Sequence, residues 1–318
     1  MDVFLTSFNA VSPILLLGGL GWLIKRLGHI DEHSISVLNS ISFNYLVSIL
    51  IFNSTLTTDF YSDFDPRLII ACALGIVFLM IASWVIFGLF MKDRARRCIF
   101  IMGTFRTNYV LFAIPITITM FGHENLTAAV LLIPVAIILF NFFGIIVLAY
   151  HSQNSTSIAQ SVLRTVIDFC KNPQILGAVF GIALSLARIQ LPQFLMGGIG
   201  FIASAAPVIS LLLLGAQLDF KKLAGDLKPV LAMCTVRLVI APAIILPFLI
   251  GAGFRGPELC ALLMVFATPM AVNCLVMARN YNIDPPFAAQ SVMVSMVLSI
   301  PTMFIFISLL TGLGLFYS

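Results

Sequence analysis

The sequence predicts an all-α integral membrane protein with ten transmembrane helices, arranged as two inverted repeats of five helices in which helices 4 and 9 are broken. The first observation behind this prediction is composition: 60% of the 318 residues are hydrophobic, 9% are charged, and the mean hydropathy is +1.10. A soluble domain carries about 25% charged residues. The chain is therefore expected in a lipid bilayer, with no nucleic-acid partner. The other two observations are the number of long apolar segments and the distribution of Lys and Arg between them.

Ten segments are long and apolar enough to cross a membrane, which takes roughly 20 residues. They cover residues 8–27, 36–55, 68–91, 98–121, 126–149, 173–190, 195–217, 230–250, 258–280 and 286–312. The longest connection, 151–172, places Ile158, Val162, Val166 and Phe169 at helical spacing, which predicts a short helix on the membrane surface. It separates a first repeat, 1–150, from a second, 173–318.

The positive charges predict the orientation. Twelve Lys and Arg residues lie in connections 1-2, 3-4, 5-6, 7-8 and 9-10, and only Arg67, Arg188 and Arg255 lie on the other face. Because cytoplasmic loops are enriched in Lys and Arg, both termini are expected outside the cytoplasm, in the plasma membrane. Each half has an odd number of spans, so the second half runs opposite to the first. This is the pattern of an inverted repeat.

Short sequence matches between the halves agree with that symmetry. "TTDFYSDFDPRL" follows span 2 and "QLDFKKLAGDLKPV" follows span 7, each with Asp-Phe, a second acid and a proline. Aligning Ala128-Ala129 with Ala288-Ala289 places Asn108 opposite Thr268. "GGLG" (18–21) and "GGIG" (197–200) lack a following Lys-Ser/Thr, so close helix packing is favoured over phosphate binding.

Spans 4 and 9 combine prolines with polar residues. Thr107 and Asn108 precede Pro115 in span 4, and Thr268 and Asn273 flank Pro269 in span 9. We expect interruptions near 107–115 and 268–275, whose exposed helix N-termini would suit a carboxylate. The alternatives are simple proline kinks and asparagines that hydrogen-bond between helices.

Two arginines lie well inside predicted spans, Arg106 in span 4 and Arg237 in span 8. Each either snorkels to the interface or needs an anionic or carbonyl partner. All acids lie near span ends, which makes the substrate the natural partner; Arg237 is placed on a candidate anion path. The four histidines fall in connections, so the coupling ion, H⁺ or Na⁺, stays open together with uncoupled transport.

The chain resembles the auxin efflux carrier family in its compact bacterial form. The resemblance lies in "FRTN" followed by "IP" in span 4, "LLLLGAQLDF" closing span 7, and "ATPMAVN" with "MA" in span 9. It implies an organic-anion carrier in which Pro115 and Pro269 are the crossing prolines, with Asn108 and Asn273 beside them. The proline that many members carry in span 2 is missing from "NYLVSILIF".

The predicted function is alternating-access transport of a small organic anion, a mono- or dicarboxylate. Arg106, Thr107, Asn108, Thr268 and Asn273 are the predicted substrate-binding residues. No catalytic residue, metal site or cofactor is predicted. An anion channel is the first alternative, although a filter-like sequence is missing. A membrane-embedded enzyme is the second, although G-x-S-x-G and H-E-x-x-H are missing. The oligomeric state stays open, with a homodimer among the alternatives.

Overall fold

A computed structural model describes residues 2–58, 65–151, 171–218 and 227–317, and in these ranges the protein is helical apart from an isolated backbone bridge. The helices of the first half are α1 (Asp2–Arg26), α2 (Glu32–Ile41), η1 (Ser42–Leu46), α3 (Val47–Thr57), α4 (Pro66–Phe90), α5 (Arg94–Phe105), α6 (Tyr109–Phe121), η2 (His123–Asn125) and α7 (Thr127–His151). Those of the second half are α9 (Pro173–Leu186), α10 (Gln193–Ala216), α11 (Leu227–Thr235), η4 (Val236–Ile240), α12 (Ala241–Gly251), α13 (Gly256–Ala267), α14 (Asn273–Asn280) and α15 (Pro285–Gly312). The predicted surface helix in 151–172 lies almost wholly outside the described residues.

Seven helical stretches are long and apolar enough to span a bilayer. They are Val3–Arg26, Glu32–Thr57, Pro66–Phe90, Thr127–Leu148, Gln193–Ala216, Leu227–Gly251 and Pro285–Gly312, matching predicted spans 1, 2, 3, 5, 7, 8 and 10. The other three predicted spans are not single long helices. Predicted span 6 contains the 14-residue α9, and predicted spans 4 and 9 are each divided into two shorter helices.

Acidic and amide side chains explain where several helices begin. Asp31, Asp65, Asp93, Asn172 and Asp284 precede α2, α4, α5, α9 and α15, and each side chain accepts a hydrogen bond from a backbone amide of the first turn. Such caps satisfy amides that lack a partner at a helix N-terminus. The acids at the predicted span ends therefore serve, at these positions, to start helices.

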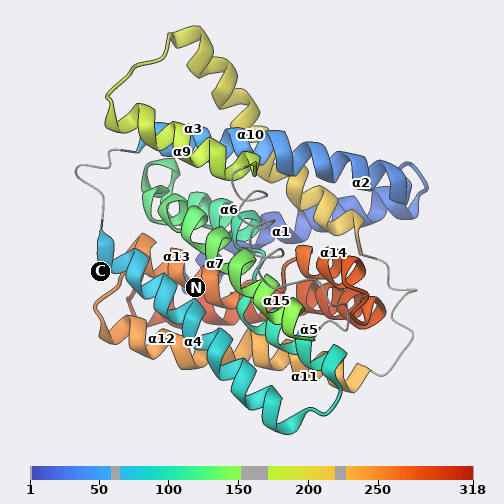
Figure 1. The fold of residues 1–318 in the computed structure, drawn as a ribbon. Helices are drawn as coiled ribbons and strands as arrows, with labels where there is room; N and C mark the ends of the chain where they lie inside the picture. The colour runs from blue at the N-terminus through green and yellow to red at the C-terminus, as the bar shows by residue number, and fades with distance from the viewer. Residues whose placement is uncertain (1, 59–64, 152–170, 219–226, 318) are drawn as a thin grey trace.

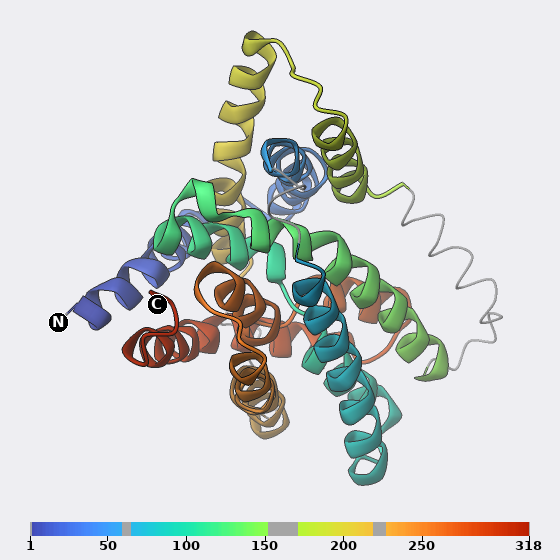
Figure 2. The same cartoon turned by 90° about the vertical axis from the view of Figure 1, so that its left-hand side faces the viewer.

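The helices pack as two groups (Figures 1 and 2). The frame group comprises α1, α2, α3, α9 and α10, in which α3 packs along α9 and α1 along α10. The crossing group comprises α4 to α7 and α11 to α15. In both views α3, α9 and α10 lie at the top, while α4, α5, α11 and α12 lie at the bottom. The two groups meet where α1 contacts α15 and α6, where α10 contacts α6, and where α3 contacts α7.

Glycines hold the frame group together. A Cβ added at Gly215 of α10 would stand 1.8 Å from the carbonyl oxygen of Gly18, and one at Gly21 would stand 1.8 Å from that of Leu212. Close packing by the 18–21 motif is thus confirmed. The expectation was wrong for the other motif, because a Cβ at Gly197, Gly198 or Gly200 would meet no atom within 4 Å. Small residues allow close backbone approach only where a partner helix is present.

Candidate functional site

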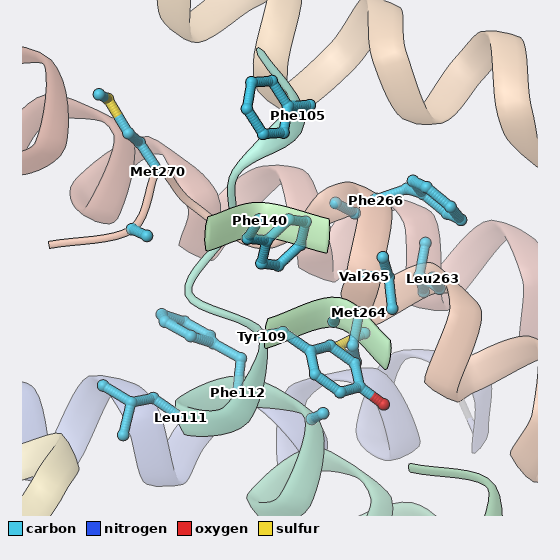
Figure 3. Packing of buried hydrophobic residues seen from close by; sticks show 14 of the residues in the cluster. Phe105, Tyr109, Leu111, Phe112, Phe140, Leu263, Met264, Val265, Phe266 and Met270 are labelled. Carbon is cyan, nitrogen blue, oxygen red and sulfur yellow. The ribbon is translucent and has the colours of Figure 1, made fainter. Parts of the chain in front are cut away.

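Two breaks in the helices lie side by side in the crossing group. α5 ends at Phe105 and α6 begins at Tyr109, while α13 ends at Ala267 and α14 begins at Asn273. Interruptions were predicted near 107–115 and 268–275, and the structure has them at 106–108 and 268–272. Figure 3 shows the first break as an extended trace between Phe105 and Tyr109, with Met270 of the second break on one side of it and Phe266 on the other.

The two breaks are joined by their own backbones. The amide of Asn108 donates to the carbonyl oxygen of Pro269 at 2.9 Å, and the amide of Ala271 donates to that of Arg106 at 3.3 Å. Together these bonds form an antiparallel bridge between Thr107 and Met270. Backbone groups in lipid need partners inside the protein. Each interrupted segment therefore provides hydrogen-bond partners for backbone groups of the other segment.

Arg237 lies at this crossing and is fully buried. It projects from η4, a π-helical turn between α11 and α12. Its guanidinium donates to three carbonyl oxygens: Nε to Thr268 at 2.9 Å, one terminal nitrogen to Thr104 at 2.8 Å, and the other to Val265 at 3.1 Å. These carbonyls belong to the C-terminal ends of α5 and α13. Neither snorkelling nor an open anion path describes this side chain, because it is fully buried and hydrogen-bonds to three main-chain oxygens.

Arg106 is also buried, at 4% exposure. One terminal nitrogen donates to the carbonyl oxygen of Phe140 and approaches the sulfur of Met277, each at 3.0 Å, and the other donates to Oδ1 of Asn141 at 2.8 Å. Gly144 leaves room for it, since a Cβ there would stand 2.7 Å from the guanidinium. Three polar or polarisable groups of the chain thus hold Arg106, which does not snorkel.

Asn108 and Thr107 are two of the described residues with a buried side-chain atom that has no hydrogen-bond partner. The others are Thr117, Ser291, Ser308 and Thr311, none of which lies in a helix break. The side chains of Asn108 and Thr107 lie at the N-terminus of α6, at 8% and 5% exposure. Nδ2 of Asn108 and Oγ1 of Thr107 have no hydrogen-bond partner among the described residues. An unpaired buried polar group costs about 1–3 kcal/mol. These two groups, beside the free amides of the first turn of α6, are available to a ligand.

The remaining predicted site residues are arranged less symmetrically than expected. Thr268 is fully buried, its hydroxyl donating to the carbonyl oxygen of Met264 at 2.8 Å. Asn273 begins α14 with an exposed side chain, in contrast to buried Asn108. Pro269 lies in the second break, whereas Pro115 lies inside α6. Placing the first crossing at Pro115 was therefore wrong, because the helix continues through that proline and is interrupted at 106–108 instead.

A cavity of about 710 Å³ lies between the two helix groups. It is lined from the frame group by residues of α1, α3 and α10 and from the crossing group by α6, η2 and the start of α7. Pro115 is on its wall, together with hydroxyl groups that include Thr57, Thr119 and Ser204. A much smaller void of about 10 Å³ shares Pro115 with it and reaches Val110, in the first turn of α6. The cavity thus points toward the break but ends short of Asn108.

Sequence reasoning missed several residues of this region. Asn141, the partner of Arg106, is an isolated amide in an apolar helix, a signal by which it could have been found. Ser295 accepts a hydrogen bond from the amide of Met270 at 3.2 Å. Glu124 is the acid on the cavity wall, and the sequence did not single it out among the acids near span ends. Nothing in the sequence joins α10 to α6, so the cavity itself was not predictable.

Comparison with known proteins decides the family. A family model described as "Membrane transport protein" matches residues 6–307. The chain belongs to this family, the auxin efflux carrier family. It is a multi-pass membrane transporter family, so this member is a membrane transport protein.

The similar proteins include full-length and partial matches. An uncharacterized transporter of Methanothermobacter thermautotrophicus is 23% identical over 300 residues, which cover 94% of this chain and 96% of the relative. Another, from Methanocaldococcus jannaschii, is 22% identical over 92% of this chain and 95% of the relative. Auxin efflux carrier component 2 of Arabidopsis thaliana is 27% identical over 146 residues, 44% of this chain but 23% of the relative's length.

Proposed function

We propose that this transporter is a secondary carrier of a small organic anion, and that the anion binds at the N-terminus of α6. The observation that carries the proposal is the pair of buried, unpartnered polar groups on Thr107 and Asn108. Helix N-termini carry partial positive charge and free amides, which favour carboxylates. The other predicted residues do not bind the anion in this proposal. Arg106 and Thr268 stabilise the breaks through hydrogen bonds, and Asn273 begins α14 with an exposed side chain.

The charges near the cavity favour a monoanion over a dianion. No Lys or Arg is among the residues that line it, and Glu124 is. Both buried arginines of the crossing already bind groups of the chain. A second carboxylate would therefore find no free cation here and would lie closer to Glu124. We infer a monocarboxylate whose apolar body lies toward Leu50 and Pro115, which line both the cavity and the small void that reaches Val110.

The position of the cavity between the two groups supports alternating access. The cavity wall includes Thr57 at the end of α3 and Glu124 between α6 and α7, and both belong to the face that is poor in Lys and Arg. By the positive-inside rule this face is extracytoplasmic in the plasma membrane, with both termini on the same side. The conformation described is then open outward, and movement between the two groups would carry the site across.

The ten-helix, inverted-repeat arrangement belongs to the same proposal. It counts each broken pair, α5 with α6 and α13 with α14, as one span and includes the short α9. Its support is that repeats 1–150 and 173–318 each contribute to both groups and each supply one break. Broken helices at the repeat interface are the usual location of carrier sites. The homodimer remains an untested alternative to a monomer.

A ligand screen tests the proposal. Purified protein is heated with monocarboxylates and dicarboxylates of matched size, because a ligand that binds the folded state raises the melting temperature. We expect a monocarboxylate to stabilise the wild type and to bind Asn108→Ala about five-fold more weakly or worse, from the loss of roughly 1 kcal/mol or more. Asn44→Ala is the matched control, since its side chain is exposed and donates a hydrogen bond to the hydroxyl of Ser40.

The screen can also contradict the proposal. Wild-type affinity in Asn108→Ala would remove the proposed site. Stabilisation by dicarboxylates alone would overturn the inference that the substrate is a monocarboxylate. A flux far above the turnover rates of carriers would favour the channel.

A further inference from the structure

The C-terminal ends of α5 and α13, which carry partial negative charge, lie close together at the crossing. Thr104 lies in the last turn of α5, Val265 lies in the last turn of α13, and Thr268 caps α13. The last carbonyls of a helix lack intrahelical partners and carry a partial negative charge. Two such ends in a buried, apolar setting repel each other unless a cation lies between them. Arg237 bridges them, with hydrogen bonds of 2.8 to 3.1 Å to all three carbonyl oxygens.

Those carbonyl oxygens have the chemistry of a cation site. In carriers with broken helices, unwound carbonyls and half-helix C-termini coordinate the coupling Na⁺ or H⁺. Here the same kind of oxygen cluster is filled by a side chain. The guanidinium is always charged and presents several donors in a rigid plane, which suits three oxygens better than an ammonium group.

Arg106 does not share this arrangement, although it lies in the same break. Its oxygen partners, Phe140 and Asn141, both belong to α7, and its third contact is the sulfur of Met277. It therefore connects the break to a neighbouring helix and leaves the two C-terminal ends to Arg237. The π turn of η4 adds a residue to the helical turn at Arg237, and such turns recur at functional sites.

We propose that Arg237 is a resident cation: its guanidinium permanently occupies the carbonyl cluster at the crossing, so that this carrier needs no Na⁺ or other inorganic cation there. The inference about coupling rests on the proposed carrier function. The occupation of the cluster rests only on the geometry of Arg237 and can be tested without any substrate.

The experiment measures melting temperatures of purified protein in NaCl, KCl and choline chloride at equal ionic strength, with and without millimolar methylguanidinium. We expect the wild type to melt at the same temperature in all solutions. Arg237→Ala should melt lower and should recover roughly 3 °C or more with methylguanidinium or Na⁺ relative to choline, because a cation then binds the emptied cluster. Arg237→Lys should keep the charge and remain insensitive to Na⁺.

Arg255→Ala is the matched control. Arg255 also donates to main-chain carbonyls, those of Ile250 and Phe254, but at the end of one helix outside the crossing. Its loss should not be rescued by any cation. If Arg237→Ala fails to fold, the wild type and Arg237→Lys still decide the question.

Two results would overturn the proposal. One is a wild type, or Arg237→Lys, that requires Na⁺ for stability. The other is a folded Arg237→Ala that melts at one temperature in every solution. Since no carboxylate is present, failure of the monocarboxylate site would leave these outcomes unchanged.

Discussion

The frame group and the crossing group hold their helices together in different ways. In lipid, apolar side chains gain little by leaving the surrounding tails, so helices associate through close packing and hydrogen bonds. The frame group uses close packing: Gly18 and Gly215 bring α1 and α10 together, and Gly177 and Gly181 bring α9 against α3. A few side-chain hydrogen bonds, such as that between Ser42 and Ser210, add to it. The crossing group uses hydrogen bonds between broken backbones and two buried arginines.

The difference shows which region can bind a ligand. Close packing of the frame helices leaves their backbone groups paired, so the frame group contributes side chains to the cavity wall but no free backbone donors. A broken helix exposes both a negative and a positive end. Arg237 satisfies the negative ends at Thr104 and Val265, while the positive end at Asn108 keeps unpaired donors beneath the cavity. The frame group thus forms one wall of the cavity, and the crossing group supplies the unpaired donors.

The largest effect is expected from Gly215→Ala, which disrupts the packing of the frame group. Gly215→Ala places a Cβ against the backbone of Gly18, which cannot move aside as a flexible side chain can. Overpacking costs about 1–3 kcal/mol or more, and we expect a strong loss of folded, monodisperse protein. Gly197→Ala is the control, because no atom lies within 4 Å of its Cβ. Size-exclusion chromatography after detergent extraction measures both. Equal yields would show that glycine contacts do not stabilise the frame group.

A smaller effect is expected in the crossing group from Asn141→Ala. The substitution leaves one end of the buried Arg106 guanidinium without its 2.8 Å partner. Loss of a hydrogen bond to a charged group costs roughly 1.5–3 kcal/mol. We expect a melting temperature lower by several degrees and a carrier that still folds. Asn44→Ala, at an exposed amide, should melt like the wild type. An unchanged melting temperature in Asn141→Ala would mean that water replaces the amide.

Part of this account was predictable from sequence, and the reason differs between residues. Composition and apolar length predicted a multi-pass helical membrane protein, because the bilayer imposes both. The breaks were predictable because Thr107, Asn108, Thr268 and Pro269 are costly in lipid unless they serve a site. The same reasoning misplaced the first crossing at Pro115, since a proline kink and a broken helix look alike in sequence.

The partners of the arginines could not be predicted from sequence. A carbonyl oxygen is present at every residue, so no residue type marks Thr104, Val265 and Thr268 as the cluster that receives Arg237. Only the approach of α5 and α13, far apart in the chain, creates it. For the same reason a search for acids left the substrate as the natural partner of Arg106, when Phe140 and Asn141 of α7 hold it.

Accessibility of the cavity tests the central claim, that it leads from outside to an anion site at Asn108. Ser204→Cys places a thiol on the α10 wall. The five described native cysteines are buried, and Cys170, which lies outside the described residues, is replaced by Ser in the background. Ser34→Cys, at a partly exposed position of α2 on the face expected to be cytoplasmic, is the control.

In intact cells, a membrane-impermeant maleimide should label Ser204→Cys and not Ser34→Cys. A monocarboxylate found in the screen should slow labelling of Ser204→Cys by several-fold, and should do so much less when Asn108→Ala is added, because the ligand then binds more weakly at the end of the cavity. Labelling of Ser204→Cys that the monocarboxylate slows equally with and without Asn108 would contradict the account, as would labelling of Ser34→Cys alone.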